Sequence, residues 1–262
     1  MPAGGDWGRS GAPPQPEQPL LTLEGVSKAF AGVRAVRDVS FEVPAGAVLG
    51  VMGPNGSGKT TLFNLIGGAL RPDRGRIRVR DADITGLPPH RVCAHGIART
   101  FQHVRPFPGL SALDNVLVGQ LYGRRRARGA AAVGEAERLL ALVGLTDKAR
   151  LPSARLTLLE RRRLELARAL ATGPDLLLLD EFMAGLTPSE TADAMGVIRQ
   201  VRDAGVTLLV VEHIVWALLD LSDRIVVLSA GEKIADGPPA AVAADPAVVD
   251  AYLGSRESRA HA

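Results

Sequence analysis

A glycine-rich stretch in the first quarter of the chain has the residue types and spacing that bind phosphate. Residues 53–61 read Gly-Pro-Asn-Gly-Ser-Gly-Lys-Thr-Thr and fit the pattern G-x-x-x-x-G-K-[ST]. Glycines let successive backbone N–H groups point inward, and a helix N-terminus behind them favours an anion. Lys59 can reach the outer phosphates, and the Thr60 hydroxyl can hold Mg²⁺. The predicted nucleoside triphosphate site comprises Gly53, Pro54, Asn55, Gly56, Ser57, Gly58, Lys59, Thr60 and Thr61.

The segments on either side of this loop have the character that such a site needs. The apolar run 47–52 predicts a strand that leads into the loop, and the run 61–66 predicts a helix that leaves it. This context argues against the alternative of a glycine-rich turn that binds nothing.

A second candidate feature, an acidic pair, follows another apolar run. Residues 176–181 read Leu-Leu-Leu-Leu-Asp-Glu. A buried strand would bring Asp180 to its carboxyl end, where open α/β sheets bind ligands. There Asp180 could hold Mg²⁺, and the Glu181 carboxylate could accept a proton from an attacking water. By itself the run is equally typical of a strand that ends in solvated acids, so its meaning depends on the phosphate loop.

Composition narrows the class of protein. The chain has 262 residues, is 46% hydrophobic and 23% charged, and has a formal net charge of +3. No apolar run approaches the length of about 18 residues that a membrane helix needs. The single cysteine, Cys93, excludes an internal disulfide and is expected to pack as a small side chain. The arginine runs 124–126 and 161–163 are interpreted as solvated surface, so no nucleic-acid partner is predicted.

The order of patterns predicts an α/β fold. Residues 1–19 are expected to be a disordered extension and 255–262 a loose tail. Helical patterns dominate from about 88 to 155, whereas the unalternating apolar runs 176–179, 206–211 and 225–228 suit central strands of a parallel sheet. We expect a phosphate-loop NTPase (RecA-like) parallel-sheet core, an antiparallel β subdomain and an inserted helical subdomain.

From about residue 20 to 254, the chain resembles the nucleotide-binding subunit of ATP-binding cassette (ABC) transporters. Gln102 falls where that family keeps a glutamine that contacts Mg²⁺ and water, and His213 falls where it keeps a histidine that faces the γ-phosphate. Phe30 matches the aromatic residue that stacks on adenine, with a plain core aromatic as the alternative. The segment 184–187 lies at the D-loop, where Thr187 replaces the family's usual aspartate, so the usual D-loop contact across the dimer is in question.

Several stretches resemble more closely the ATP-binding proteins of the branched-chain amino acid importer. They are residues 83–90, 96–102, 105–110, 211–214 and 251–254. The region around Gln102 resembles the first of that importer's two ATPase subunits. The resemblance leaves the substrate open, because related cassettes carry amides or urea.

The family's signature motif, usually Leu-Ser-Gly-Gly-Gln, is altered. The matching residues are Leu156, Thr157, Leu158, Leu159 and Glu160. Thr157 and Glu160 can form a capping box at the start of a helix. Leu159 replaces a glycine that lets the backbone approach a γ-phosphate, and Glu160 adds negative charge there. We therefore hypothesise an asymmetric dimer. In it, this chain's phosphate loop and the partner's signature form a working site, whereas this chain's own signature supports a weaker one.

The resemblance implies an ATPase that binds ATP and Mg²⁺ and works as a subunit of an amino-acid importer. Its implied partners are a second ABC ATPase subunit, in a homo- or heterodimer, transmembrane permease subunits and, indirectly, a substrate-binding protein. It would lie at the cytoplasmic face of the plasma membrane, held there by the permeases. Two alternatives stay open: a soluble ABC ATPase without a transport role, and a regulatory ATP-binding subunit with low turnover.

Overall fold

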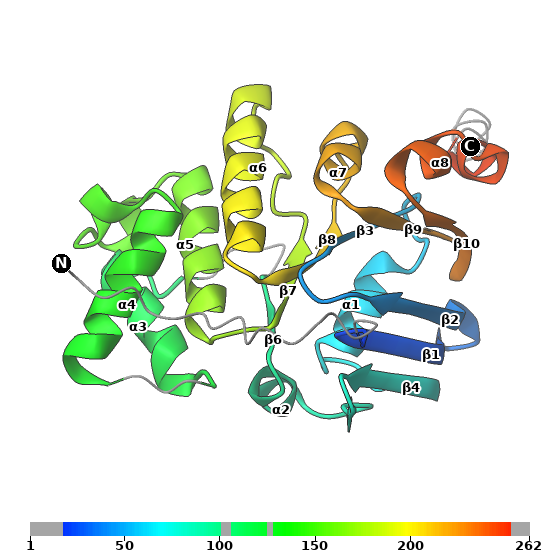
Figure 1. Ribbon diagram of the computed structural model, residues 1–262, viewed down its shortest axis with the longest axis horizontal. Helices are drawn as coiled ribbons and strands as arrows, with labels where there is room; N and C mark the ends of the chain where they lie inside the picture. The colour runs from blue at the N-terminus through cyan, green and yellow to red at the C-terminus, as the bar shows by residue number, and fades with distance from the viewer. Residues whose placement is uncertain (1–17, 101–105, 125–127, 253–262) are drawn as a thin grey trace.

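A six-stranded sheet forms the centre of the molecule. The structure is a computed structural model that describes residues 18–100, 106–124 and 128–252. The sheet has the order β10-β9-β3-β8-β7-β6, and only β10 is antiparallel to its neighbour (Figure 1). In this spatial order the strands are Glu232–Gly237, Arg224–Ser229, Val48–Met52, Thr207–Val211, Leu176–Asp180 and Ile97–Arg99.

The unalternating apolar strands are covered on both faces, as their sequences predict. In β7, Leu177 and Leu179 pack into one core, whereas Leu176 and Leu178 pack into the other. The first core lies between the sheet and the larger helices. The second lies between this sheet and a smaller antiparallel one.

The antiparallel sheet has four strands in the order β2-β1-β4-β5. They are Val33–Val43, Leu21–Phe30, Arg74–Val79 and Ala82–Asp83. Helix α1, Lys59–Ile66, lies between the two sheets and buries Leu62 and Phe63 in the second core (Figure 1). This layer places the start of α1, and the loop before it, at the edge where both sheets meet.

Helices cover the other face of the central sheet. α6 (Pro188–Asp203) and α7 (Val215–Leu221) pack directly on it, and α3 (Ala112–Tyr122), α4 (Gly129–Leu142) and α5 (Leu158–Ala171) form a group at the β6 end (Figure 1). Short elements complete the described chain: α2 at Pro89–Ala94, α8 at Pro239–Ala243 and 3-10 turns at Thr146–Lys148 and Ser153–Arg155. None of the helices described here has the length and apolar character that a membrane crossing needs.

The predicted fold class is confirmed, whereas the predicted domain limits stay a prediction. Strand β6 lies inside the range 88–155 but belongs to the central sheet, and α5 lies beyond that range but packs against α3 and α4. Residues 1–17 of the expected extension, and the tail 255–262, lie outside the described residues.

Candidate functional site

The phosphate loop connects β3 to α1 through backbone conformations that favour glycine. Gly53 has φ +150° and Gly58 has φ +104°. A Cβ on Gly53 would come within 2.1 Å of the Leu228 carbonyl oxygen, and one on Gly58 within 2.3 Å of the Ala35 carbonyl oxygen. The loop is therefore seated against β9 and β2 so closely that a side chain at either position would displace it.

Lys59, the first residue of α1, turns its ammonium group back along the loop. It donates to the carbonyl oxygens of Gly53 (2.6 Å) and Pro54 (3.0 Å) and is 6% exposed. Burial lowers the pKa of Lys59 from its ordinary value, and the carboxylates of Glu181 and Asp180 act in the opposite direction. A buried cation at this loop suits an anionic ligand.

Three neighbouring parallel strands end at the same level beside this loop. Val211 of β8 pairs with Val51 of β3 on one side and with Asp180 of β7 on the other. The residues that follow each strand therefore share one edge of the sheet. They are the phosphate loop after β3, Glu181 after β7 and His213 after β8.

Glu181 and His213 are in contact at this edge. The Nε2 atom of His213 lies 2.8 Å from Oε1 of Glu181. Glu181 has φ +51°, a left-handed conformation that is strained for a residue with a side chain. Such strain persists where surrounding contacts hold it, and here the Glu181 N–H donates to the Val211 carbonyl at 2.9 Å.

Asp180 and Thr60 offer oxygen ligands that fit Mg²⁺. Thr60 is exposed in the first turn of α1, and Asp180 is a carboxylate at the end of β7. A buried ion pair already holds Asp180, because Arg99 donates to its Oδ2 at 2.7 Å and to Asn64 Oδ1 at 2.7 Å. Arg99 was given no role by the sequence, and it ties β6 to β7 and α1. Gln102, the third predicted Mg²⁺ contact, lies outside the described residues.

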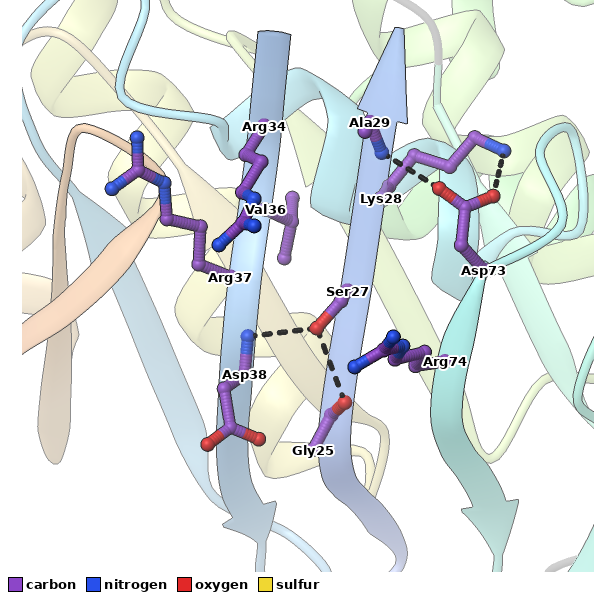
Figure 2. A pocket seen from close by; sticks show the side chains of 10 residues that line it. All are labelled: Gly25, Ser27, Lys28, Ala29, Arg34, Val36, Arg37, Asp38, Asp73 and Arg74. Atoms are coloured by element: carbon purple, nitrogen blue, oxygen red, sulfur yellow. Dashed lines mark hydrogen bonds and ion pairs between the residues drawn. The ribbon is translucent and has the colours of Figure 1, made fainter. Parts of the chain in front are cut away.

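A charged hollow of about 490 Å³ lies on the antiparallel sheet between β1, β2 and the start of β4 (Figure 2). The Asp73 carboxylate there is bonded to Lys28 Nζ (2.7 Å) and to the Ala29 N–H (2.8 Å). The Asp73 carboxylate thus partly neutralises the basic residues that line the hollow. The hollow is lined by the sheet's residues and so is distinct from the phosphate loop.

Phe30 ends β1 with 43% of its surface exposed, and Lys28 Nζ lies 5.6 Å from its ring centroid. This exposure disfavours the alternative of a core aromatic. It leaves a ring face available for a base, so adenine stacking by Phe30 stays a prediction.

The altered signature begins α5 in the way that its sequence predicts. Thr157 is the N-cap, its side chain accepts the Glu160 N–H, and Glu160 accepts the Thr157 N–H at 2.9 Å. Glu160 also pairs with Lys148. The pKa of Glu160 is lowered: burial opposes the change, but the bonds from Lys148 and Thr157 outweigh it. Its negative charge is therefore compensated within this chain, which the sequence did not indicate.

Two further residues contact the turn after β7 and were missed from the sequence. Arg162 is buried in α5, so the interpretation of the run 161–163 as solvated surface is wrong for this residue. Glu212, between β8 and His213, is 3% exposed and accepts the Met183 N–H at 2.8 Å.

Thr187 caps α6 with Glu190, a role that an aspartate could also fill.

The C-terminal part of the chain also reaches the phosphate loop. The Gly53 N–H donates to the hydroxyl of Tyr252 at 2.8 Å. Tyr252 belongs to the segment 251–254, one of the stretches that carry the resemblance. Its position next to the loop could not be read from sequence, because the two residues are 199 positions apart.

The chain matches known proteins over most of its length. Residues 36–184 match the family model described as ABC transporter, and residues 232–258 match that of the branched-chain amino acid ATP-binding cassette transporter. The high-affinity branched-chain amino acid transport ATP-binding protein BraF of Pseudomonas aeruginosa is 39% identical over 253 residues, 90% of this chain and 98% of its own. LivG of Escherichia coli, which carries the same description, is 37% identical over 252 residues with the same coverage.

This chain belongs to the ATP-binding proteins of ABC transporters. The cassette is similar to the crystal structure of the ADP conformation of MJ1267, an ATP-binding cassette of an ABC transporter, with a TM-score of 0.83, 31% identity and coverage of 90% and 99% of the two chains. It also resembles the cassette MJ0796 in a dimeric post-hydrolysis state bound to ADP and Pi, with a TM-score of 0.74, 25% identity and coverage of 84% and 98%. The cassette is an ATPase, since ATP hydrolysis coupled to transport is the activity of this family.

Glu212 predicts a particular dependence of stability on pH. Burial raises its pKa from 4.5 to about 7, against the bond from the Met183 N–H and the charge of Arg162; the Glu181 carboxylate adds to the rise. Between pH 4.5 and 7 the folded cassette keeps a proton that the unfolded chain has released, so stability falls as pH rises through this window. Glu212→Gln should remove this fall, which amounts to at most about 3 kcal/mol of unfolding free energy.

Urea unfolding of both proteins at pH 4.5, 6 and 8 would measure it. Glu190→Gln is the control. The Thr187 N–H lowers the pKa of Glu190, so the Glu190 carboxylate makes stability rise with pH, and Glu190→Gln should remove that rise. An unchanged pH dependence in Glu212→Gln would show that Glu212 is ionised in the folded cassette at pH 5.

Proposed function

We propose that this cassette is the ATPase subunit of an importer for branched-chain or other amino acids. The observation that carries the proposal is its similarity to BraF and LivG along nearly their whole length. The match of residues 232–258 to a branched-chain amino acid cassette model supports the same substrate class. Nothing in the site itself selects the cargo, because the cassette binds ATP and the permeases bind the substrate.

The proposed reaction is ATP + H₂O → ADP + phosphate. The loop amides and Lys59 hold and neutralise the β- and γ-phosphates. Bound Mg²⁺, held by Thr60, Asp180 and Gln102, would neutralise charge that develops on the phosphate oxygens. Glu181 positions or deprotonates the attacking water, and His213, 2.8 Å from it, contacts the γ-phosphate.

The proposed assembly is a dimer of cassettes bound to permeases. The dimeric structure of MJ0796 supports pairing. In the proposed dimer, one chain's phosphate loop faces the other chain's signature segment. The partners would be a second ABC ATPase subunit, transmembrane permeases and, through them, a substrate-binding protein. In this assembly the cassette would be a peripheral subunit at the cytoplasmic face of the plasma membrane.

The signature segment supports an asymmetric pair, and Leu159 gives a stronger reason for it than Glu160 does. Glu160 is compensated by Lys148 and the helix cap, so its charge is a weaker obstacle to a phosphate than the sequence suggests. Leu159, by contrast, places a branched side chain in the first turn of α5. Leu159 is therefore the main candidate for weakening the second site.

A regulatory subunit with low turnover is favoured by Leu159 alone. Against it, Glu181 and His213 are in contact, which suits a working hydrolytic site. The soluble, non-transport alternative is disfavoured by the full-length similarity to transport proteins.

Substitution of Glu181 tests the proposed chemistry. Glu181→Gln should bind ATP but turn it over at least about 100-fold more slowly, because the carboxylate that accepts the proton is gone. Lys59→Ala should lose ATP affinity, because a buried cation beside the phosphates is removed. Equilibrium binding of a fluorescent ATP analogue and phosphate release measure the two effects.

The same variants test the transport role in cells. In a strain that lacks the gene, wild-type cassette should restore uptake of radiolabelled leucine, isoleucine or valine, and Glu181→Gln should not. Restoration by Glu181→Gln, or purified Glu181→Gln with wild-type turnover, would contradict the proposed mechanism. Active cassette that restores no amino-acid uptake would contradict the substrate class alone.

Leu159→Gly in the assembled transporter tests the asymmetry. Turnover should rise about tenfold, which corresponds to about 1.4 kcal/mol of transition-state stabilisation, because the backbone can approach the partner's γ-phosphate. Glu160→Gln should change turnover little, since the charge is already compensated. Ser189→Gly, at the same position of α6, controls for the helix destabilisation that glycine causes. Equal turnover in Leu159→Gly and Ser189→Gly would refute the proposed asymmetry.

A further inference from the structure

A buried arginine of α5 binds the backbone of the turn that follows β7. Arg162 is 8% exposed. Its Nη1 donates to the carbonyl oxygens of Glu181 (2.5 Å) and Phe182 (2.7 Å), and its Nη2 donates to that of Ala184 (2.7 Å). Because a guanidinium group presents its donors in a rigid plane, these three carbonyls are held in a fixed relation to α5.

The same turn is held from its other side by the segment after β8. The Met183 N–H donates to Oε1 of Glu212 at 2.8 Å, and Glu212 directly precedes His213. Four successive residues, 181–184, are therefore fixed through their main chain by two buried side chains, Arg162 and Glu212. One of these side chains comes from α5 and the other from the edge that carries His213.

The contacts of Arg162 and Glu212 hold a turn that contains a strained residue. Glu181 has φ +51°, and such a conformation persists where its surroundings determine it. Its N–H is bound by the Val211 carbonyl and its carbonyl by Arg162. With both ends of the residue fixed, the carboxylate is aimed at His213, 2.8 Å away.

We propose that Arg162 is a positioning residue for Glu181, and that it couples the place of this carboxylate to the place of α5. The inference rests on the proposed role of Glu181 in hydrolysis. α5 begins directly after Thr157 of the signature segment, and Arg162 lies in its second turn. A shift of the helix when its signature meets the partner's nucleotide is thus passed to Glu181 of the same chain.

An adjacent arginine allows the contacts of Arg162 to be distinguished from the effect of its positive charge on α5. Arg161 is the adjacent residue, and its guanidinium donates to the carbonyl oxygen of Ala154, away from the turn 181–184. Arg161→Gln therefore removes the same charge from the same helix without releasing the turn. It is the matched control for Arg162→Gln.

The test compares kcat for ATP hydrolysis with ATP affinity in the full-length protein, under conditions in which the wild-type cassette is dimeric. Arg162→Gln should lower kcat by about 10- to 100-fold, because the catalytic carboxylate is misplaced, and leave the Kd for ATP within about twofold of wild type. Hydrogen exchange of the segment 181–187 should accelerate. Arg161→Gln should show neither change.

Arg162→Lys provides a second variant should Arg162→Gln not fold. Its ammonium keeps the charge but cannot span three carbonyls, so kcat should lie between those of wild type and Glu181→Gln, at wild-type ATP affinity. Wild-type kcat in either Arg162 variant, or equal losses in kcat and ATP affinity, would overturn the inference. Glu181→Gln in the same assay separates the two proposals. If Glu181→Gln hydrolyses ATP at the wild-type rate, the proposed function fails. If Glu181→Gln is slow but Arg162→Gln has the same kcat as Arg161→Gln, only the inference about Arg162 fails.

Discussion

The site depends on the level at which three parallel strands end. β3, β8 and β7 are in a register that brings Val51, Val211 and Asp180 into line. The phosphate loop, Glu181 and His213 follow these strands, Asp180 ends β7, and Lys59 and Thr60 begin the helix after the loop. The central sheet can hold this edge rigidly because both its faces are buried, one under helices and the other under α1 and the antiparallel sheet.

Buried cations organise the edge that the strands create. Lys59, Arg99 and Arg162 are each largely enclosed, and each binds backbone carbonyls or a carboxylate. A buried charge is tolerated only when it is compensated, so these residues fix their partners as firmly as the partners fix them. One consequence is that the phosphate loop, Asp180 and the turn after β7 are each tied to a different element: α1, β6 and α5. Each of these elements is therefore in direct contact with the site.

The sequence was sufficient for the fold class and for the elements that carry the predicted chemistry. The phosphate-loop pattern and the unalternating run 176–179 are local signals, and both lie where their patterns predict, in a loop between β3 and α1 and in a strand covered on both faces. Arg162, Glu212 and Tyr252 could not be found in this way, because their contacts join segments far apart in the chain. Arg162 lies in a run of three arginines, and only the packing of α5 decides which of the three is buried.

The central claim is that this cassette contains half of each ATP site and needs a second cassette to hydrolyse ATP. Turnover per molecule, measured against protein concentration with the oligomeric mass determined in the same samples, tests it most directly. A half-site predicts that turnover per molecule is negligible in dilute, monomeric protein and rises as dimers form or as a partner subunit is added. Constant turnover per molecule from verified monomers would contradict it.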